Sequence, residues 1–174
     1  MNNVNAFDIE FKDNIEIYKK AKKNLRMYNF QWKKYAGEHS VGNCAYLFDK
    51  LKPLNYKDFF YKYIKDGEES DEADETKRGR TREEIFEISK NYLKSIDNSC
   101  IPLEMCIDEY IMHVIIETFD GHMRELIIQK SLEEKGFKLV HGDKDEDSKL
   151  NIDFKVYKNN VLKYFIQVKP HTCF

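Results

Sequence analysis

The sequence predicts an α/β protein whose N-terminal half is helical and whose C-terminal half holds a small mixed β-sheet. Before residue 137, apolar residues recur every three or four positions along several segments, which is the spacing of amphipathic helices. Residues 150–174 instead contain two runs in which apolar and polar residues alternate, as they do in β-strands. Asn159-Asn160 separates the two runs and is typical of a hairpin turn.

The length of the chain, 174 residues, suits one domain, and we treat residues 1–174 as a single domain with two parts. Residues 1–100 are the expected helical part, and residues 101–174 are the part that carries the sheet. Hydrophobic residues make up 41% of the chain and charged residues 34%, which is the profile of a soluble globular protein.

Charge and cysteine content narrow the functional classes. The formal net charge of -2 gives no general attraction to nucleic acid, so any phosphate-binding surface must be local. The four cysteines show no CxxC or other zinc-site spacing and fit reduced thiols in the cytoplasm. No apolar run is long enough to span a bilayer and the polar start lacks a signal-peptide core, so we expect no membrane partner.

A lysine-rich helix is expected over residues 13–35, where Ile17, Ala21 and Leu25 have helical spacing. Its basic side chains suggest either an ordinary solvated face or a face that follows phosphates. These side chains are Lys19, Lys20, Lys22, Lys23, Arg26, Lys33 and Lys34.

Four later segments have helical spacing together with capping or terminating residues: residues 44–51, 55–67, 82–96 and 121–136. We expect Asn55 and Thr81 to be N-caps, and Gly67 and Gly136 to end their helices. Residues 103–119 fit either a buried helix or a helix that runs into a strand, and we favour the helix.

A turn is expected at Asp120-Gly121, between that helix and the next one. Residues 137–140 are the expected first strand of the sheet, and the charged loop after them lacks the spacing of a calcium site.

Residues 67–82 have the most unusual composition, with an acidic run followed directly by four basic residues: Lys77, Arg78, Arg80 and Arg82. The acidic part is typical of an exposed loop, because packing it would bring like charges together. The basic part could contact phosphates or send an arginine to a guanine edge. The alternative is a solvated loop in which Thr81 caps the helix that follows.

The hairpin is the strongest chemical signal in the sequence. If the apolar faces of its two strands meet the same core, Asp153 lies on the same side as Gln167 and Lys169. A regular two-residue turn would instead set Asp153 opposite Ile166 and turn Gln167 to the other face. We therefore expect the chain to avoid the common two-residue turn. It should use an odd-length loop, or a β-bulge that shifts the register by one, with an Asn in the left-handed region.

This group has the chemistry of a magnesium site. The carboxylate of Asp153, the amide oxygen of Gln167 and the carbonyl of Val168 are hard oxygen ligands, which suit Mg²⁺. Lys169 could activate a metal-bound water and neutralise charge on a phosphate. The alternative is that Asp153 and Lys169 are solvated residues at strand ends.

The pattern Asp153 then Gln167-Val168-Lys169 resembles the active site of PD-(D/E)XK nucleases, with glutamine in place of the second acidic residue. More narrowly, residues 45–172 resemble the MjaI-type family of type II restriction endonucleases. The segments that carry this resemblance are Pro53-Leu54-Asn55-Tyr56, Arg78-Gly79-Arg80-Thr81, Glu117-Thr118, Asp120-Gly121, Arg124-Glu125, Asp153 and Gln167-Val168-Lys169-Pro170.

The resemblance implies a PD-(D/E)XK nuclease-like core in residues 101–174. It implies Mg²⁺ bound by Asp153, Gln167, the Val168 carbonyl and Glu125, with Lys169 as the catalytic lysine; Glu117 is a weaker candidate than Glu125.

The implied partner is double-stranded DNA, cut at a short and palindromic site by a cytoplasmic homodimer. The residues implied to contact the DNA are Lys77, Arg78, Arg80, Arg82 and His171. Two other functions fit the same residues. One is a structure-selective nuclease of the junction-resolvase or repair type, and the other is a non-catalytic DNA-binding module.

Overall fold

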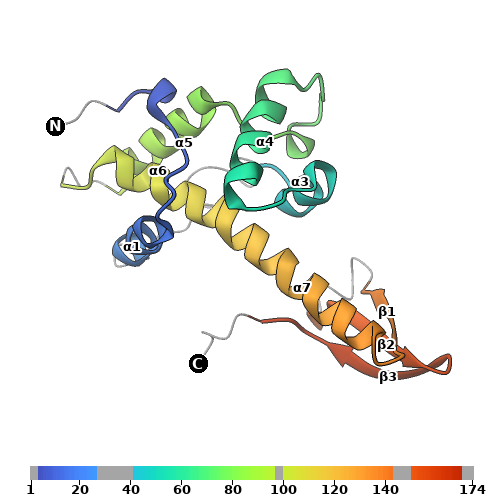
Figure 1. The fold of residues 1–174 in the computed structure, drawn as a ribbon. Coiled ribbons are helices and arrows are strands. Elements are labelled where there is room, and N and C mark those ends of the chain that lie inside the picture. The colour runs from blue at the N-terminus through green and yellow to red at the C-terminus, as the bar shows by residue number, and fades with distance from the viewer. Residues whose placement is uncertain (1–3, 27–40, 97–99, 143–149, 170–174) are drawn as a thin grey trace. The chain divides into compact units, whose positions relative to one another are not determined.

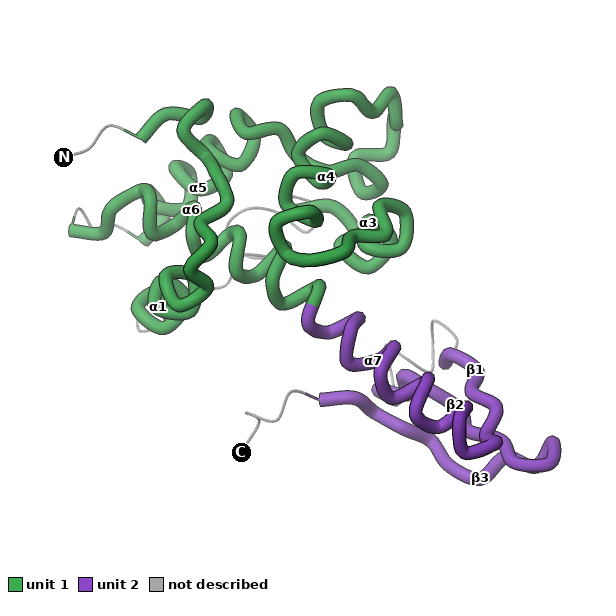
Figure 2. Tube along the Cα trace, in the orientation of Figure 1, with its two compact units in different colours: residues 1–119 green, residues 120–174 purple. Residues whose placement is uncertain are grey.

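The computed structural model describes residues 4–26, 41–96, 100–142 and 150–169 (Figure 1). The chain divides into two compact units, Met1–Phe119 and Asp120–Phe174 (Figure 2). The first unit is helical in its described part, and the second contains the sheet, so the expected mixed α/β class is confirmed. The boundary between the units lies inside a helix, whereas the expected division at residue 100 falls ahead of that helix.

The first unit is built from helices of different lengths. They are η1 (Ala6–Asp8), α1 (Ile15–Arg26), α3 (Cys44–Leu51), α4 (Tyr56–Glu69), η2 (Glu75–Lys77), α5 (Arg82–Ser95), α6 (Leu103–Ile111) and the π-helical turn η3 (Met112–Ile116). Helix α7 (Glu117–Glu133) follows directly and crosses the boundary into the second unit. None of the helices in the described part is long and apolar enough to cross a membrane.

The expected N-caps are confirmed. The Asn55 side chain accepts a hydrogen bond from the Asp58 backbone N–H at 2.9 Å and so starts α4. Thr81 starts α5 through a reciprocal capping box with Glu84. Each cap satisfies backbone N–H groups that have no partner within the helix.

Gly67 does not end its helix, because α4 continues to Glu69. The glycine serves a close approach instead. A Cβ atom at this position would lie 2.4 Å from the backbone carbonyl carbon of Arg80. The prediction of a helix end at Gly67 is therefore wrong, and the sequence signal reflected tertiary packing.

The turn expected at Asp120-Gly121 is also wrong, because both residues lie inside α7. Helices α6, η3 and α7 follow one another without interruption, which confirms the helix at residues 103–119. The residues around η3 are buried on almost all sides, and such burial favours a core helix over a half-exposed strand.

The second unit contains strands β1 (Lys138–His141), β2 (Phe154–Lys158) and β3 (Val161–Ile166), in the order β1-β2-β3. Both strand pairings are antiparallel, so the sheet is not mixed as expected. Neighbouring strands in this sheet follow one another along the chain without an intervening crossover helix, and such connections give antiparallel pairs.

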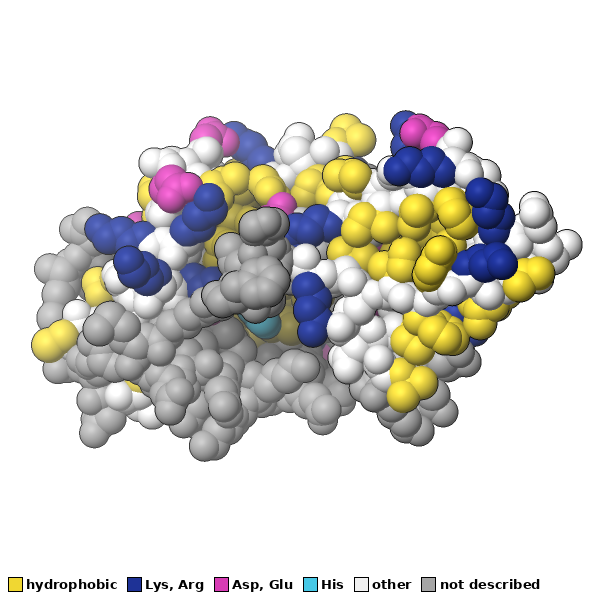
Figure 3. Space-filling view, turned by 90° about the horizontal axis from the view of Figure 1, so that it is seen from below, with side chains coloured by type: hydrophobic (Ala, Val, Ile, Leu, Met, Phe, Trp, Pro, Cys, Tyr) yellow, Lys and Arg dark blue, Asp and Glu magenta, His cyan; other side chains and the backbone are white. Residues whose placement is uncertain are grey.

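One face of β2 is packed and the edge strand β3 is open. Phe154 and Val156 are buried, in the same compact unit as the Asp120–Glu133 part of α7 (Figure 2). Large apolar side chains of β3 are exposed: Val161, Leu162, Tyr164 and Phe165. Seen from below, hydrophobic side chains form a broad patch over this unit, with lysine and arginine side chains beside it (Figure 3).

The hairpin has a two-residue turn and a bulge. Lys158 pairs with Val161 around Asn159 and Asn160, whose φ angles are 53° and 61°. The expectation that this turn would be avoided is therefore wrong. The register then shifts between Val156 and Tyr157, so that Phe154 pairs with Ile166. The shift by a bulge and the left-handed Asn residues confirm the second form of the prediction.

Candidate active site

Asp153 lies where the three strands come together. Its backbone N–H donates to the carbonyl of Ile166 at 2.9 Å, and its own carbonyl accepts from the N–H of Gly142 at 3.0 Å. The residue is thus fixed on one side to the end of β3 and on the other to the end of β1. These two hydrogen bonds fix the backbone of Asp153, and therefore the position from which its side chain extends at the end of the sheet.

The Asp153 carboxylate reaches the segment that the sequence predicted. Its Oδ2 atom accepts a hydrogen bond from the backbone N–H of Val168, the residue between Gln167 and Lys169. The bulge makes this possible, because it sets Phe154 opposite Ile166 as the last strand pair before the site. The structure therefore brings Asp153 to the backbone of residues 167–169.

Within the described residues, no three His, Cys, Asp or Glu side chains gather as a metal site, so a metal at Asp153 would depend on amide, carbonyl and water oxygens. The residue is half-buried, and no ion pair involves its carboxylate in the described part of the chain. Gln167 and Lys169 are exposed beside it, so hydrated Mg²⁺ could reach the oxygen ligands of this segment.

A comparison with known protein families assigns the chain that carries this hairpin to a family. The model of the MjaI restriction endonuclease family matches residues 23–173, which is nearly the whole chain. The chain belongs to the MjaI restriction endonuclease family. No curated protein and no solved structure gave a match.

Membership identifies this chain as a restriction endonuclease, a hydrolase whose substrate is DNA. The matched region includes the Asp153 hairpin, helix α7 and the basic block 77–82, but it starts inside α1. Most of α1 therefore lies outside the region that the MjaI family model covers.

Two glutamates of α7 are candidates to complete the endonuclease site. Glu125 lies in the same compact unit as Asp153, is half-buried, and has its carboxylate 4.0 Å from His122 on its own helix. Glu117 lies in the first unit, where it forms an ion pair with Lys22 and lies 3.2 Å from the ring of His113. The assignment of Glu125 to the site stays a prediction, and Glu117 has structural partners of its own.

The basic block of the endonuclease is engaged within the first unit. Arg80 is only 4% exposed, and its guanidinium donates to the carbonyls of Glu75, Arg78 and Gly79 at 3.0, 2.9 and 2.8 Å. Arg78 forms a two-pronged pair with Glu84, at 3.0 and 2.6 Å. Neither guanidinium points freely to solvent, so each supports the loop.

The other two basic residues of the block also have partners. Arg82 donates to the carbonyl of Ile9 at 3.1 Å and to Glu68 at 3.2 Å, and Lys77 pairs with Asp74 at 3.3 Å. Contact between this block and DNA stays a prediction, while the structure gives the block a second role in holding α4 and α5 to their loop. His171, the remaining expected DNA contact, lies outside the described residues.

Glu84 shows the electrostatic effect of this arrangement. Partial burial alone would raise the pKa of its carboxyl, but the hydrogen bonds from Arg78 and from the Thr81 backbone lower the pKa below its usual range. Arg78 is also an expected DNA contact, and that role stays a prediction. The Thr81-x-x-Glu84 capping box was the signal that could have suggested an internal partner.

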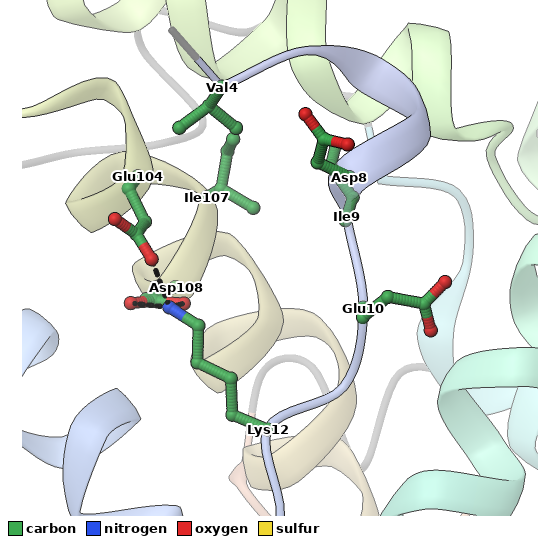
Figure 4. A pocket seen from close by; sticks show the side chains of 8 residues that line it. All are labelled: Val4, Asp8, Ile9, Glu10, Lys12, Glu104, Ile107 and Asp108. Carbon is green, nitrogen blue, oxygen red and sulfur yellow. Dashed lines mark hydrogen bonds and ion pairs between the residues drawn. The ribbon is translucent and has the colours of Figure 1, made fainter. Parts of the chain in front are cut away.

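A pocket in the first unit is not suited to DNA (Figure 4). Lys12 lies in it and bridges Asp108 and Glu104, at 2.7 and 2.9 Å. Asp8 and Glu10 add two more carboxylates to the lining. Because carboxylates outnumber the single ammonium group there, the pocket would repel a phosphate.

Proposed function

We propose that this chain is a type II restriction endonuclease that hydrolyses both strands of DNA at a short, palindromic site with Mg²⁺. Family membership supports the restriction activity. The main support for the site is the environment of the Asp153 carboxylate. This carboxylate is half-buried and forms no ion pair among the described residues. It accepts a hydrogen bond from the backbone of the segment that bears Gln167 and Lys169.

The proposed fold of this site is the PD-(D/E)XK core, with Asp153 on one strand and Gln167-Val168-Lys169 at the end of the next. Asp153, the Gln167 amide oxygen and the Val168 carbonyl would hold the metal, with Glu125 completing the ligand set directly or through water. Bound Mg²⁺ would supply Lewis-acid polarisation of the scissile phosphate and acidify a water.

The residues of this chain then have separate tasks. The N–H of Val168 orients the Asp153 carboxylate, so the ligand is fixed before the metal binds. The Lys169 ammonium is exposed and can neutralise the negative charge that develops on the phosphate oxygens. A cytoplasmic homodimer would place two such sites on the two strands of a palindrome.

The activity is tested by incubating plasmid DNA with the purified chain in Mg²⁺ or in EDTA. We expect discrete fragments in Mg²⁺ and intact DNA in EDTA, and sequencing the fragment ends would give the recognition site. Cutting only at branched junctions would favour the structure-selective nuclease. Binding without any cutting would favour a non-catalytic module.

A further inference from the structure

Helix α1 has one buried face and one cationic face. Tyr18, Ala21 and Leu25 are buried at the i, i+3, i+7 spacing of a packed helix face. The residues on the other side include three exposed lysines, which we call the α1 lysine face: Lys19, Lys20 and Lys23.

Two of these lysines have no carboxylate partner in the described part of the chain. Lys19 pairs with Glu16, also exposed, at 2.7 Å, but no ion pair among the described residues involves Lys20 or Lys23. Other lysines of this unit do have carboxylate partners, among them Lys57 with Asp13 and Lys90 with Glu87. Glu16 is the single acidic residue of α1, so the helix presents excess positive charge.

The excess positive charge of α1 does not follow from the composition of the whole chain. The chain has 31 acidic and 29 basic residues, so a cationic surface requires that lysines gather away from carboxylates. A DNA-cutting enzyme needs such a surface, because phosphate neutralisation supplies most of its general affinity. In the block expected to provide it, Arg80 is buried and Arg78 is paired with Glu84, so a second cationic surface would add to the attraction for phosphates.

The spacing on α1 suits a row of phosphates. Lys19 and Lys23 are four residues apart, which is about 6 Å along a helix axis. Phosphates on one strand of a duplex follow at about 3.4 Å of axis rise, so the lysines can reach neighbouring phosphates. Lysine is a flexible point charge and fixes position on the backbone without reading bases.

A further ion pair holds the helix in place. Lys22 points from α1 to Glu117, at the junction of η3 and α7. Its side chain is 18% exposed, so this lysine anchors the helix while its neighbours face outward.

We propose that the α1 lysine face binds the phosphate backbone of duplex DNA without sequence preference. The proposal rests on the proposed function, because it assigns the electrostatic part of DNA binding to a surface of the same enzyme. The surface is mostly outside the family-matched region, which begins at residue 23.

The test is equilibrium binding of a fluorescent duplex to the full chain in EDTA, where no cutting is expected, across a series of salt concentrations. We expect the triple variant Lys19→Gln, Lys20→Gln, Lys23→Gln to bind at least about tenfold more weakly at low salt, equally for unrelated sequences. The slope of log affinity against log salt should become shallower by about 0.9 for each phosphate that the variant no longer neutralises.

Two matched variants complete the experiment. Replacing Lys65, Lys90 and Lys94 with Gln removes the same charge from α4 and α5, and binding should stay within about twofold of wild type. Replacing the three α1 lysines with Arg keeps the charge and should restore binding.

Equal weakening in the α1 and control triples would overturn the proposal, as would an unchanged salt slope in the α1 triple. If the wild-type chain cuts plasmid DNA while the α1 triple binds normally, the lysine face is wrong and the proposed function stands. If the wild-type chain neither binds nor cuts DNA, both proposals fail.

Discussion

Arg80 is a buried cation held by backbone carbonyls, and Asp153 is a half-buried anion held by a backbone N–H. The two residues show how burial decides what a charge does. Arg80 is satisfied within the protein, so its charge supports the fold. No ion pair of Asp153 lies among the described residues, which agrees with the proposed role of its carboxylate as a metal ligand.

Arg80→Met should destabilise the protein by about 2–4 kcal/mol, because the carbonyls of Glu75 and Arg78 would lose their donor and the carbonyl of Gly79 would keep only its bond from Arg78. Urea unfolding followed by circular dichroism measures this destabilisation. Arg124→Met is the matched control, since the one ion pair of Arg124 among the described residues is a long, partly exposed pair with Asp120 at 3.7 Å, and it should cost less than about 1 kcal/mol. Similar stabilities for the two variants would contradict the internal role of Arg80.

Glu84 makes a pH-dependent contribution to stability. Its folded-state pKa is lowered, so the stabilisation is present above the unfolded-state pKa of about 4.3 and is lost as the pH falls through the folded value. The free energy of unfolding should therefore differ most between wild type and Glu84→Gln at about pH 6–7. The difference should shrink below about pH 4.

Glu83→Gln removes an exposed carboxylate from the same helical turn and should change stability by less than about 0.5 kcal/mol. A Glu84 effect that stays constant from about pH 7 to about pH 3 would show that the Arg78 pair does not stabilise the fold.

At the scale of elements, two glycines allow α4 and the basic loop to touch. A Cβ atom at Gly79 would lie 1.8 Å from the carbonyl oxygen of Tyr63, and Gly67 faces the Arg80 backbone. The sequence marks both positions as glycine. The close backbone contacts that require these glycines could not be predicted from the sequence, because they join segments that are distant from each other along the chain.

Gly79→Ala should destabilise the protein by roughly 2–4 kcal/mol, because a backbone carbonyl cannot move away as a side chain would. Gly121→Ala offers an opposite control in the interior of α7, where a Cβ atom meets nothing within 4 Å. That substitution should stabilise the helix by about 0.5–1 kcal/mol. Thermal melts of the two variants should move in opposite directions.

The hairpin is the element that the sequence predicted best. Alternation of apolar residues required a register shift, and the structure has a bulge between Val156 and Tyr157. The shift could be predicted because the face on which a strand residue lies depends on local pattern alone. The same pattern did not select between an odd loop and a bulge, because turn geometry and strand twist decide that choice together.

Asn160→Val should destabilise the protein by about 1–2 kcal/mol, because its φ of 61° lies in the left-handed region. Asn160→Gly keeps that conformation accessible and should stay within about 0.5 kcal/mol of wild type. Equal effects of valine and glycine would show that the turn does not have this geometry in solution.

At the scale of the whole molecule, the sequence predicted a helical first part, a C-terminal sheet and the family. The expected single domain with parts at residues 1–100 and 101–174 stays a prediction, and the two compact units divide within α7. Helical periodicity shows where a helix lies but does not show which unit it serves, because that depends on contacts distant in sequence. For the same reason the composition of the 77–82 block indicated DNA, although its arginines have partners within the protein.

Whether the Asp153 hairpin cuts DNA can be tested by measuring Mg²⁺-dependent cleavage by Asp153→Asn. Asparagine keeps the size of the side chain and can still accept from the Val168 N–H, so the fold should survive while the metal loses its charged ligand. Asp71→Asn removes an exposed carboxylate from the acidic loop as the control. We predict at least about a hundredfold slower cleavage for Asp153→Asn, with unchanged melting and duplex binding, and wild-type rates for Asp71→Asn. Cleavage by a folded Asp153→Asn within a few fold of wild type would show that Asp153 is not the metal ligand of the active site.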